Sequence, residues 1–445
     1  MKKIISTLAL ATLAFGSVFA DVTFTTNYRT RMAGFSRVIN AQPKYSNDAY
    51  AEQHNSYLFA QRAYADASDD FAIGVSNDFG GAFVKINPNL KTNRSDDDRV
   101  PGLNAYYGYV NFGALTLTAG FLDGRSNGAY RLTDYIGHNL EGQDAYGQLG
   151  SMHTNAVSFK ADDITWYDGK ERPVGILTYK GEFGDTVVTA DLVAAAVDND
   201  DAKGTWDGSK IHAAFGARVD VKLPIADFQF VVKEQKNHPA KAATQTEPAK
   251  PIVTKRSVAF SVAPNFGENM SLALSASLGF YNGDLTDFNG DVRFVFKTGN
   301  IAFTSLNKIG YVTDTGVSSY NPLGYDAHVG LCFVKNDGTL GWQKNAESQS
   351  SMWNVLGFSM ELSEKLTVFA NVGDIIGFNA GKKEIGDYGM ELFAAPGVQF
   401  FATKGCSITT ALRVGVSNLL MDKDTYDKIE PAYGILVPVV MRVQL

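Results

Sequence analysis

The sequence predicts an all-β protein, a transmembrane antiparallel up-and-down β-barrel of about 16–20 strands. The main observation is a two-residue alternation, which is clearest between residues 210 and 233. Apolar side chains take every second position there, and charged side chains such as Lys210, Arg218 and Asp220 lie between them. Because side chains alternate between the two faces of a strand, each segment has an apolar face and a charged face. The runs are about twice as long as the strands of a soluble sandwich and match the roughly 9–11 residues of a tilted bilayer crossing.

Residues 1–20 have the features of a secretory signal peptide. Two lysines precede the apolar run 4–15, and Val18-Phe19-Ala20 provides a small-x-small cleavage site. We therefore expect cleavage after Ala20, export, and a mature chain 21–445 that forms one barrel. The mature segment has no apolar run of about 18 residues, so no transmembrane helix is expected.

The composition supports a strand-rich, acidic, exported protein. The chain contains 43 Gly, 29 Phe and 20 Tyr, which favour strands and turns over helices. The net charge of −7 becomes −9 once the two lysines of the signal peptide are removed. An acidic chain of this kind is not expected to bind nucleic acid.

The alternation continues along the whole chain. Predicted strands lie near residues 22–35, 55–67, 70–87, 103–112, 114–122, 172–183, 185–196, 209–222, 224–233, 253–264, 268–281, 286–297, 300–311, 324–335, 350–362, 365–377, 388–402, 405–416 and 431–445, with 338–343 as a short further candidate. The pattern is clear in 268–281, where leucines and serines take opposite faces. It is poor in 300–311, which mixes Asn307 with Lys308, and 70–87 changes register at Gly80-Gly81, where a bulge is expected.

The connections between these strands alternate in length. Tight turns are predicted at Asp69-Asp70, Phe112-Gly113, Leu223-Pro224, Thr298-Gly299 and Ser363-Glu364-Lys365, and most connections between them are long and polar. Short periplasmic turns and long external loops are typical of outer-membrane barrels. The alternation therefore places both termini in the periplasm of a diderm bacterium, with about 18–20 strands, or 16 if the weak ones drop out. The sheet is expected to close, because hydrocarbon offers no hydrogen-bond partner to an open edge.

One segment, residues 104–125, resembles a known family. It reads Asn-Ala-Tyr-Tyr-Gly-Tyr-Val-Asn-Phe-Gly-Ala-Leu-Thr-Leu-Thr-Ala-Gly-Phe-Leu-Asp-Gly-Arg. Four of its features are similar to those of the general porins of Gram-negative outer membranes. They are the aromatic-Gly-Val strand, the Phe-Gly turn, the Leu-Thr-Leu strand and the Gly-x-x-Asp that opens a long loop. Two features depart from that family: its acidic loop signature is absent as such, and the chain ends in Leu445 where an aromatic residue is usual.

The resemblance implies an inward-folded loop that narrows the lumen. The loop after the fifth predicted strand is 123–153, and it carries Asp123, Arg125, Arg131, Asp134, Glu141 and Asp144. In the family, acids of this loop oppose basic residues of the wall. The predicted inward-facing basic residues are Arg29, Arg31, Arg62, Arg218 and Arg293. An arginine facing lipid would cost about 2–4 kcal/mol near the midplane, which favours an inward Arg62.

Two interpretations of these arginines stay open. They could form an electrostatic constriction that sorts solutes by charge, or a generic wet wall that only keeps water in the lumen. The histidines are scattered without metal-ligand spacing, and no Gly-x-Ser-x-Gly elbow or Cys-x-x-Cys pair occurs. We therefore expect no enzyme activity, no cofactor and no metal site.

The expected function is passive diffusion of small hydrophilic solutes and ions through a water-filled lumen. A surface adhesin whose barrel anchors binding loops is an alternative, as is a channel specific for a substrate such as a sugar, for which Tyr107, Tyr109 and Phe369 are candidate lumen aromatics. The expected surroundings are outer-membrane lipid and lipopolysaccharide. The sequence leaves open whether the protein is a monomer or a homotrimer.

Overall fold

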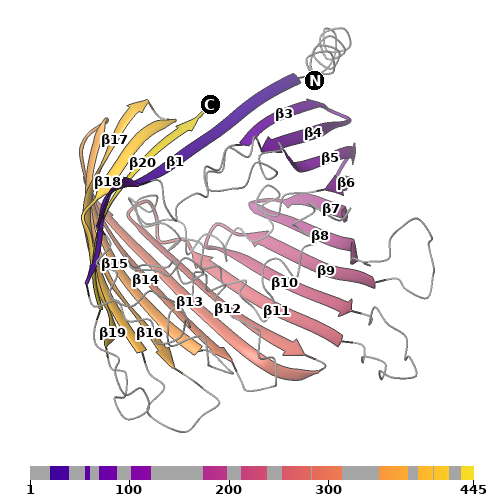
Figure 1. Ribbon diagram of the computed structural model, residues 1–445. Helices are drawn as coiled ribbons and strands as arrows, with labels where there is room; N and C mark the ends of the chain where they lie inside the picture. The colour runs from indigo at the N-terminus through magenta and orange to yellow at the C-terminus, as the bar shows by residue number, and fades with distance from the viewer. Residues whose placement is uncertain are drawn as a thin grey trace, which may run out of the picture.

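The computed structural model describes residues 21–39, 56–60, 70–87, 102–121, 174–197, 212–237, 253–281, 283–312, 350–378, 389–403, 405–419 and 432–445. These residues form one antiparallel sheet of 20 strands that closes into a barrel (Figure 1). The predicted fold class, an all-β antiparallel barrel, is confirmed. Within the described part of the chain, no helix is long and apolar enough to cross a membrane.

The strands follow one another around the wall in chain order. Their bounds are β1 (Asp21–Ile39), β2 (Ser56–Ala60), β3 (Asp70–Asn77), β4 (Gly80–Asn87), β5 (Gly102–Phe112), β6 (Leu115–Phe121), β7 (Val174–Phe183), β8 (Thr186–Val197), β9 (His212–Lys222), β10 (Ala226–Asn237), β11 (Val253–Pro264), β12 (Met270–Tyr281), β13 (Asp284–Thr298), β14 (Ile301–Val312), β15 (Ser350–Ser363), β16 (Leu366–Phe378), β17 (Gly389–Thr403), β18 (Cys406–Ala411), β19 (Arg413–Leu419) and β20 (Ala432–Gln444). Many are 11–15 residues long, which is enough for a tilted crossing of a bilayer.

Two positions in the wall are each filled by two short strands. β2 and β3 pair with the late and the early half of β1, so together they occupy one position beside it. β18 and β19 are separated by Leu412 alone and both lie between β17 and β20. The 20 strands therefore fill 18 positions around the ring, which is 20 minus the two shared ones.

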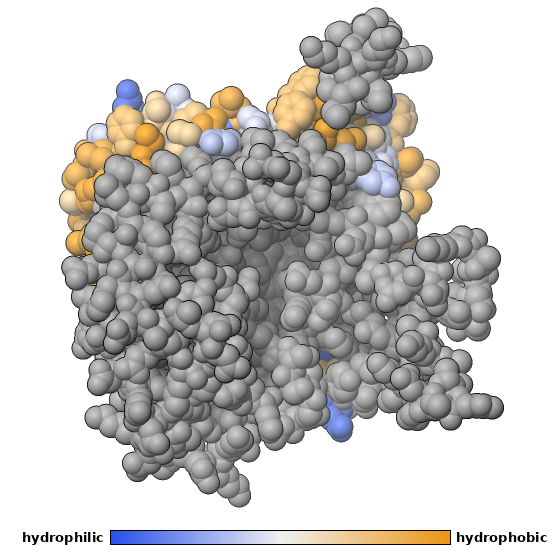
Figure 2. All heavy atoms as spheres, in the orientation of Figure 1, coloured by the Kyte–Doolittle hydropathy of each residue, from blue (hydrophilic) through white to orange (hydrophobic). Residues whose placement is uncertain are grey.

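The two faces of the wall differ as the alternation predicts. Leu177, Leu192 and Phe215 are exposed on the outer face, whereas Asp191 and Arg218, at the alternate positions of β8 and β9, are buried. Cross-strand partners share a face, and Leu177 pairs with Leu192 while Asp191 pairs with Arg218. In Figure 2, apolar side chains gather along the outer rim above β17–β20 and around β3–β6. The barrel thus has a largely apolar exterior and carries Asp191 and Arg218 on its inner face.

Tight turns join neighbouring strands at one edge of the barrel. The predicted turns after Phe112 and Thr298 are present, and each uses a glycine in the left-handed region, Gly113 at φ 66° and Gly299 at φ 56°. The prediction of a bulge at Gly80-Gly81 is wrong, because residues 70–87 form a hairpin of two strands, β3 and β4. The side chain of Asn77 stabilises this hairpin, since its Oδ1 accepts hydrogen bonds from the backbone N–H groups of Phe79 (2.9 Å) and Gly80 (3.1 Å).

The barrel closes where the first strand pairs with the last. β20 pairs with β1 over most of its length, and the backbone of Leu445 exchanges two hydrogen bonds with that of Thr26, at 2.9 and 3.1 Å. The outer face of β20 carries Met441 and Leu445, as the alternation predicts, and Val440 on the other face is buried. Leu445 is thus hydrogen-bonded into the sheet that forms the barrel wall.

Aromatic rings on the inner face lie against glycines of neighbouring strands. A Cβ on Gly81 would lie 2.8 Å from the Tyr109 hydroxyl, and a Cβ on Gly373 would lie 2.7 Å from the Phe393 ring. Gly397 leaves the same kind of space for the ring of Phe369. These glycines let large rings lie flat on the wall instead of projecting into the lumen.

Several expectations fall outside the described residues. These are the signal peptide 1–20, the constriction loop 123–153, and the predicted strands 324–335 and 338–343.

Candidate functional site

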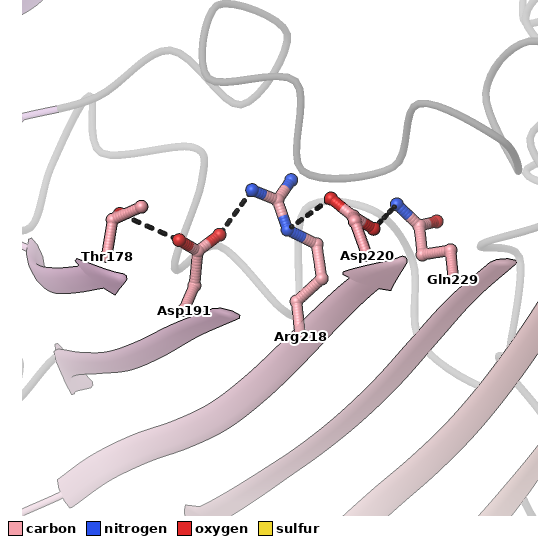
Figure 3. A network of polar contacts seen from close by, with 5 residues as sticks. All are labelled: Thr178, Asp191, Arg218, Asp220 and Gln229. Atoms are coloured by element: carbon pink, nitrogen blue, oxygen red, sulfur yellow. Dashed lines mark hydrogen bonds and ion pairs between the residues drawn. The ribbon is translucent and has the colours of Figure 1, made fainter. Parts of the chain in front are cut away.

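A row of polar side chains crosses four adjacent strands on the inner wall. Thr178 of β7, Asp191 of β8 and Arg218 of β9 lie directly opposite one another in the register. Asp220, two residues after Arg218, is opposite Gln229 of β10. Strand alternation turns all five side chains to the same face. We call these five residues the inner-wall row (Figure 3).

Hydrogen bonds and ion pairs link the row from end to end. The Thr178 hydroxyl donates to Asp191 Oδ1 at 2.7 Å, and Arg218 Nη2 forms an ion pair with Asp191 Oδ2. On its other side, Arg218 Nε lies 3.3 Å from Asp220 Oδ2, although its N–H bond does not point at that oxygen. Gln229 Nε2 then donates to Asp220 Oδ1 at 2.8 Å. The guanidinium is therefore held between two carboxylates from two strands (Figure 3).

The row carries a net negative charge and is shielded from solvent. Two carboxylates surround one guanidinium, and the side chains of Arg218, Asp191 and Asp220 are 8%, 7% and 19% exposed. Buried charges need partners, because removing one partner of a buried pair costs about 3–5 kcal/mol. The pairing explains why the sequence can place an arginine here. It also fixes the side chains in position on the wall.

The polar surface continues on both sides of the row. Thr116 of β6 is opposite Thr178, and its hydroxyl donates to Asn111 Oδ1 of β5 at 3.0 Å. On the other side, Ser261 of β11 is opposite Gln229. Gln229 Oε1 and Ser261 Oγ are buried and have no hydrogen-bond partner among the described residues. Both atoms can accept a hydrogen bond from water or a solute.

A basic side chain lies on the wall across the barrel from the row. Arg442 is on β20, where Val440 on the same face is buried and Met441 between them is exposed. In a ring of 18 positions, the β20–β1 seam is nearly opposite β9–β10. Arg442 and the inner-wall row therefore lie on nearly opposite sides of the barrel wall.

The predicted site residues divide into three groups. Arg218 is the centre of the inner-wall row, and Arg293 is half-buried on the inner face of β13. Arg29 and Arg31 lie in β1, opposite Arg442 and Val440, but their side chains are outside the described part. The others lie outside the described residues: Arg62, Asp123, Arg125, Arg131, Asp134, Glu141 and Asp144.

Sequence reasoning missed most of the residues that surround Arg218. Asp191 is the only charged residue of β8, whose sequence TVVTADLVAAAV is otherwise apolar or threonine. That isolation is a signal that could have identified it, because a lone acid in a transmembrane strand needs a partner. Gln229 and Thr178 lie beside the carboxylates of Asp220 and Asp191 because of the register between the strands. The sequence alone does not provide that register.

Inner-face aromatic side chains form a second feature on β4 and β5. The ring centroids of Phe83 and Tyr107 are 5.2 Å apart, and Tyr109 follows on the same face, two residues after Tyr107. Among the described residues, no group of three or more His, Cys, Asp or Glu side chains could hold a metal ion.

Comparisons with known proteins found similar solved structures. No family model matches the chain, and no curated protein matches it. The chain is similar to OccK8 (OprE) of Pseudomonas aeruginosa, with a TM-score of 0.49 and 8% identity over 96% of this chain and 98% of that one. It is also similar to an anion-selective porin from Comamonas acidovorans, with a TM-score of 0.46 and 11% identity over 96% of this chain and 100% of that one. For the outer membrane channel DcaP of Acinetobacter baumannii, the TM-score is 0.43 and the identity 10%, over 96% and 98% of the two chains.

Proposed function

We propose that this protein is an outer-membrane porin that lets small hydrophilic solutes and ions diffuse through a water-filled lumen. The observation that carries the proposal is the closed wall of 18 positions, apolar outside and charged inside. Barrels of about 16–18 strands are wide enough to leave an aqueous channel. A charged inner face is stable only against water or paired groups, so it favours a wet lumen.

The proposal includes the surroundings of the barrel. Residues 1–20 act as a cleaved signal peptide, both termini lie in the periplasm, and the apolar exterior contacts lipid and lipopolysaccharide. The loop 123–153 folds inward, and its charges, Asp123, Arg125, Arg131, Asp134, Glu141 and Asp144, oppose the wall arginines Arg29, Arg31 and Arg62. Arg218 and Arg293 belong to the lining of the pore.

Conductance in planar bilayers tests this function. The purified mature chain should give stepwise current increases at fixed voltage, because each inserted barrel adds one aqueous path. Folding is checked separately by the heat-dependent mobility of the barrel on denaturing gels. Folded protein that inserts without any current would contradict the proposal.

The inner-wall row makes a sharper prediction about ion preference. Asp220→Asn removes one negative charge from the lining, so it should lower the cation-to-anion permeability ratio by about twofold, equivalent to about 0.4 kcal/mol of Coulomb energy in a wet lumen. The measurement is the reversal potential in a salt gradient. The matched control is Thr178→Val, which removes the hydrogen bond to Asp191 but no charge, and it should leave the ratio unchanged. Equal ratios in wild type and Asp220→Asn would place the row outside the ion path.

A second candidate function is a channel specific for sugars. The specific observation is the run of inner-face aromatics Phe83, Tyr107 and Tyr109, since aromatic faces bind the apolar faces of sugar rings. Oligosaccharides added to an open channel would then interrupt its current, and Tyr107→Ala would abolish the interruptions. An uninterrupted current at millimolar sugar favours general diffusion.

A further inference from the structure

Breaks in the strand ladder line up across one sector of the wall, from β17 through β18–β20 and β1 to β2. Of the prolines in the described strands, Pro264 ends β11, whereas Pro396 and Pro438 lie in the interiors of β17 and β20. Proline has no backbone N–H, so within sheets it is found at edges, strand ends or bulges. Two prolines inside a closed wall therefore indicate that this sector departs from a regular ladder.

Pro396 removes one hydrogen bond from the ladder beside β17. The Leu412 N–H donates to Pro396 O at 2.8 Å. In a regular antiparallel ladder, two residues paired in this way exchange both bonds. Pro396 has no N–H to return, so the carbonyl of Leu412 receives no donor from that residue. This is also the point at which β18 ends and β19 begins, on either side of Leu412.

Pro438 removes a second bond, from the other edge of the same segment. The register of β20 with β18 and β19 places Ala411 opposite Pro438. The Gln444 N–H donates to Gly405 O at 2.7 Å, and bonded pairs recur at every second residue, so Ala411 and Pro438 occupy such a pair. Its carbonyl therefore lacks a ladder donor as well. Two successive carbonyls, those of Ala411 and Leu412, lose their donors on opposite edges of one strand.

The same level continues into β1 and β2. The pairing of β1 with β20 shifts between Ala33 and Phe35, where Gly34 is the extra residue of a bulge. In Figure 1, β1 bends sharply partway along its length. Pro438 lies opposite Ala33, and β2 ends at Ala60, which is opposite Ala33 on the other side. We call the line formed by these irregular positions the hinge line; it consists of Pro396, Leu412, Pro438 and Gly34.

The hinge line lies at a height where lipid surrounds the barrel. Leu412 is six residues after Cys406, where β18 begins beside its turn. At about 3.3 Å per residue and a tilt of about 40°, this is on the order of 15 Å from the turn edge, inside an apolar band about 25 Å tall. Lipid supplies no donor to a free carbonyl, whereas water in the lumen does. Bending that tilts the carbonyls of Ala411 and Leu412 toward the lumen therefore stabilises them.

The part of the sector beyond the hinge line, away from the tight turns, is paired less regularly than the rest of the wall. We call it the loop-side half; it consists of residues 389–395, 413–419, 432–437, 35–39 and 56–60. The pairing of β17 with β19 shifts between Met390 and Leu392. A hollow of about 590 Å³ lies on the outer face beside Leu392 and Val414. By contrast, β13 and β14 pair without a shift from Asp287 to Thr298.

We propose that this sector of the wall bends along the hinge line, so that its loop-side half moves relative to its turn-side half and changes the width of the lumen. The strands of the sector are neighbours in the sheet and so move together. The regular ladders of β13, β14 and β15 hold the rest of the ring. The proposal rests on the porin function only for the water that reaches the two carbonyls.

Distances between spin labels test the bending. In a Cys332→Ser, Cys406→Ser background, Leu392→Cys or Phe400→Cys carries a nitroxide on β17, on the loop side or the turn side of Pro396; the native side chains are 38% and 46% exposed. A second nitroxide at Leu192→Cys of β8, on the opposite wall, is the common reference. Double electron–electron resonance should give a broad distance distribution for the Leu392 pair and a narrow one for the Phe400 pair. Equal widths for the two pairs would overturn the proposal.

Replacing the prolines tests the cause of the bending. The double variant Pro396→Ala, Pro438→Ala returns an N–H to each ladder, so the distribution of the Leu392 pair should narrow to the width of the Phe400 pair. The urea midpoint of unfolding in vesicles should rise at the same time, because two hydrogen bonds are added. Pro264→Ala, at the end of β11, leaves the hinge line unchanged and should keep the distribution broad. A distribution that stays broad in the double variant contradicts the proposal.

The outcome is separable from that of the porin function. In planar bilayers, the open-channel current of the wild type should fluctuate more than that of the double variant, because motion of the wall changes the bore. A broad Leu392 distribution in a barrel that carries no current would contradict only the porin function. A conducting barrel with equally narrow distributions for both pairs would contradict only the hinge.

Discussion

At the scale of single residues, Arg218 shows how a charge is kept in the wall of the barrel. Its guanidinium lies between Asp191 and Asp220, and Thr178 and Gln229 bind the far oxygens of those carboxylates. Every charged group of the row thus has a partner on a neighbouring strand. The row joins four strands as well as lining the lumen.

The burial of this row predicts the effect of removing its centre. Arg218→Met leaves two buried carboxylates 7% and 19% exposed without their cation, so it should lower the free energy of unfolding by about 3–5 kcal/mol. The measurement is urea-induced unfolding of the barrel in lipid vesicles. Lys180→Met is the matched control, because Lys180 and Glu182 form a 3.9 Å ion pair that is 64% and 71% exposed. A similar loss in both variants would mean that the row does not stabilise the wall.

At the scale of the strands, alternation alone predicted the existence and the faces of most elements. Residues 268–281, for example, form β12 with Met270 and Leu278 outside and Ser275 inside. The hairpin of β3 and β4 was missed, because its turn depends on the side chain of Asn77 and looked like a break inside one strand. The weak pattern of 300–311 has a structural counterpart, since Asn307 shares the outer face of β14 with Phe303 and lies opposite Asn354 of β15.

Candidate site residues were harder to predict than strands. Arg218 was identified from the pattern of one strand, whereas its partners Asp191 and Gln229 come from the strands on either side. A lone sequence gives the face of each residue but not the register between strands. Sites formed across strands therefore appear only once the pairing is known.

Packing between strands predicts a specific weakness at Gly397 of β17. An added Cβ would collide with the ring of Phe369 on β16 and with the backbone oxygen of Thr410 on β18. Gly397→Ala should therefore lower stability by about 1–3 kcal/mol, as overpacking does. Gly175→Ala, where the nearest atom is Ala194 O at 3.9 Å, is the control and should be neutral or slightly stabilising. Urea-induced unfolding in lipid vesicles distinguishes the two variants. Equal free energies of unfolding in both variants would contradict the close approach of the Phe369 ring to Gly397.

At the scale of the whole molecule, the fold depends on one closure between the ends of the chain. The β1–β20 seam joins residues that are about 400 positions apart in the sequence, from Asn27 opposite Gln444 to Ile39 opposite Tyr433. An open seam would leave both strands with unpaired backbone groups in hydrocarbon, at several kcal/mol for each group. Closure is therefore the step that makes the exterior compatible with a membrane.

A disulfide across the seam would test closure directly. Tyr28 lies opposite Val443, and opposite residues in an antiparallel pair have Cα atoms about 4.5–5.5 Å apart, within the range of a disulfide. In a Cys332→Ser, Cys406→Ser background, Tyr28→Cys with Val443→Cys should oxidise completely and give a reducible shift in gel mobility. Tyr28→Cys with Phe183→Cys, on a strand far around the ring, should stay reduced. Because the first pair can meet only if β1 and β20 are neighbours, a seam pair that stays reduced in folded protein would mean that the barrel is open.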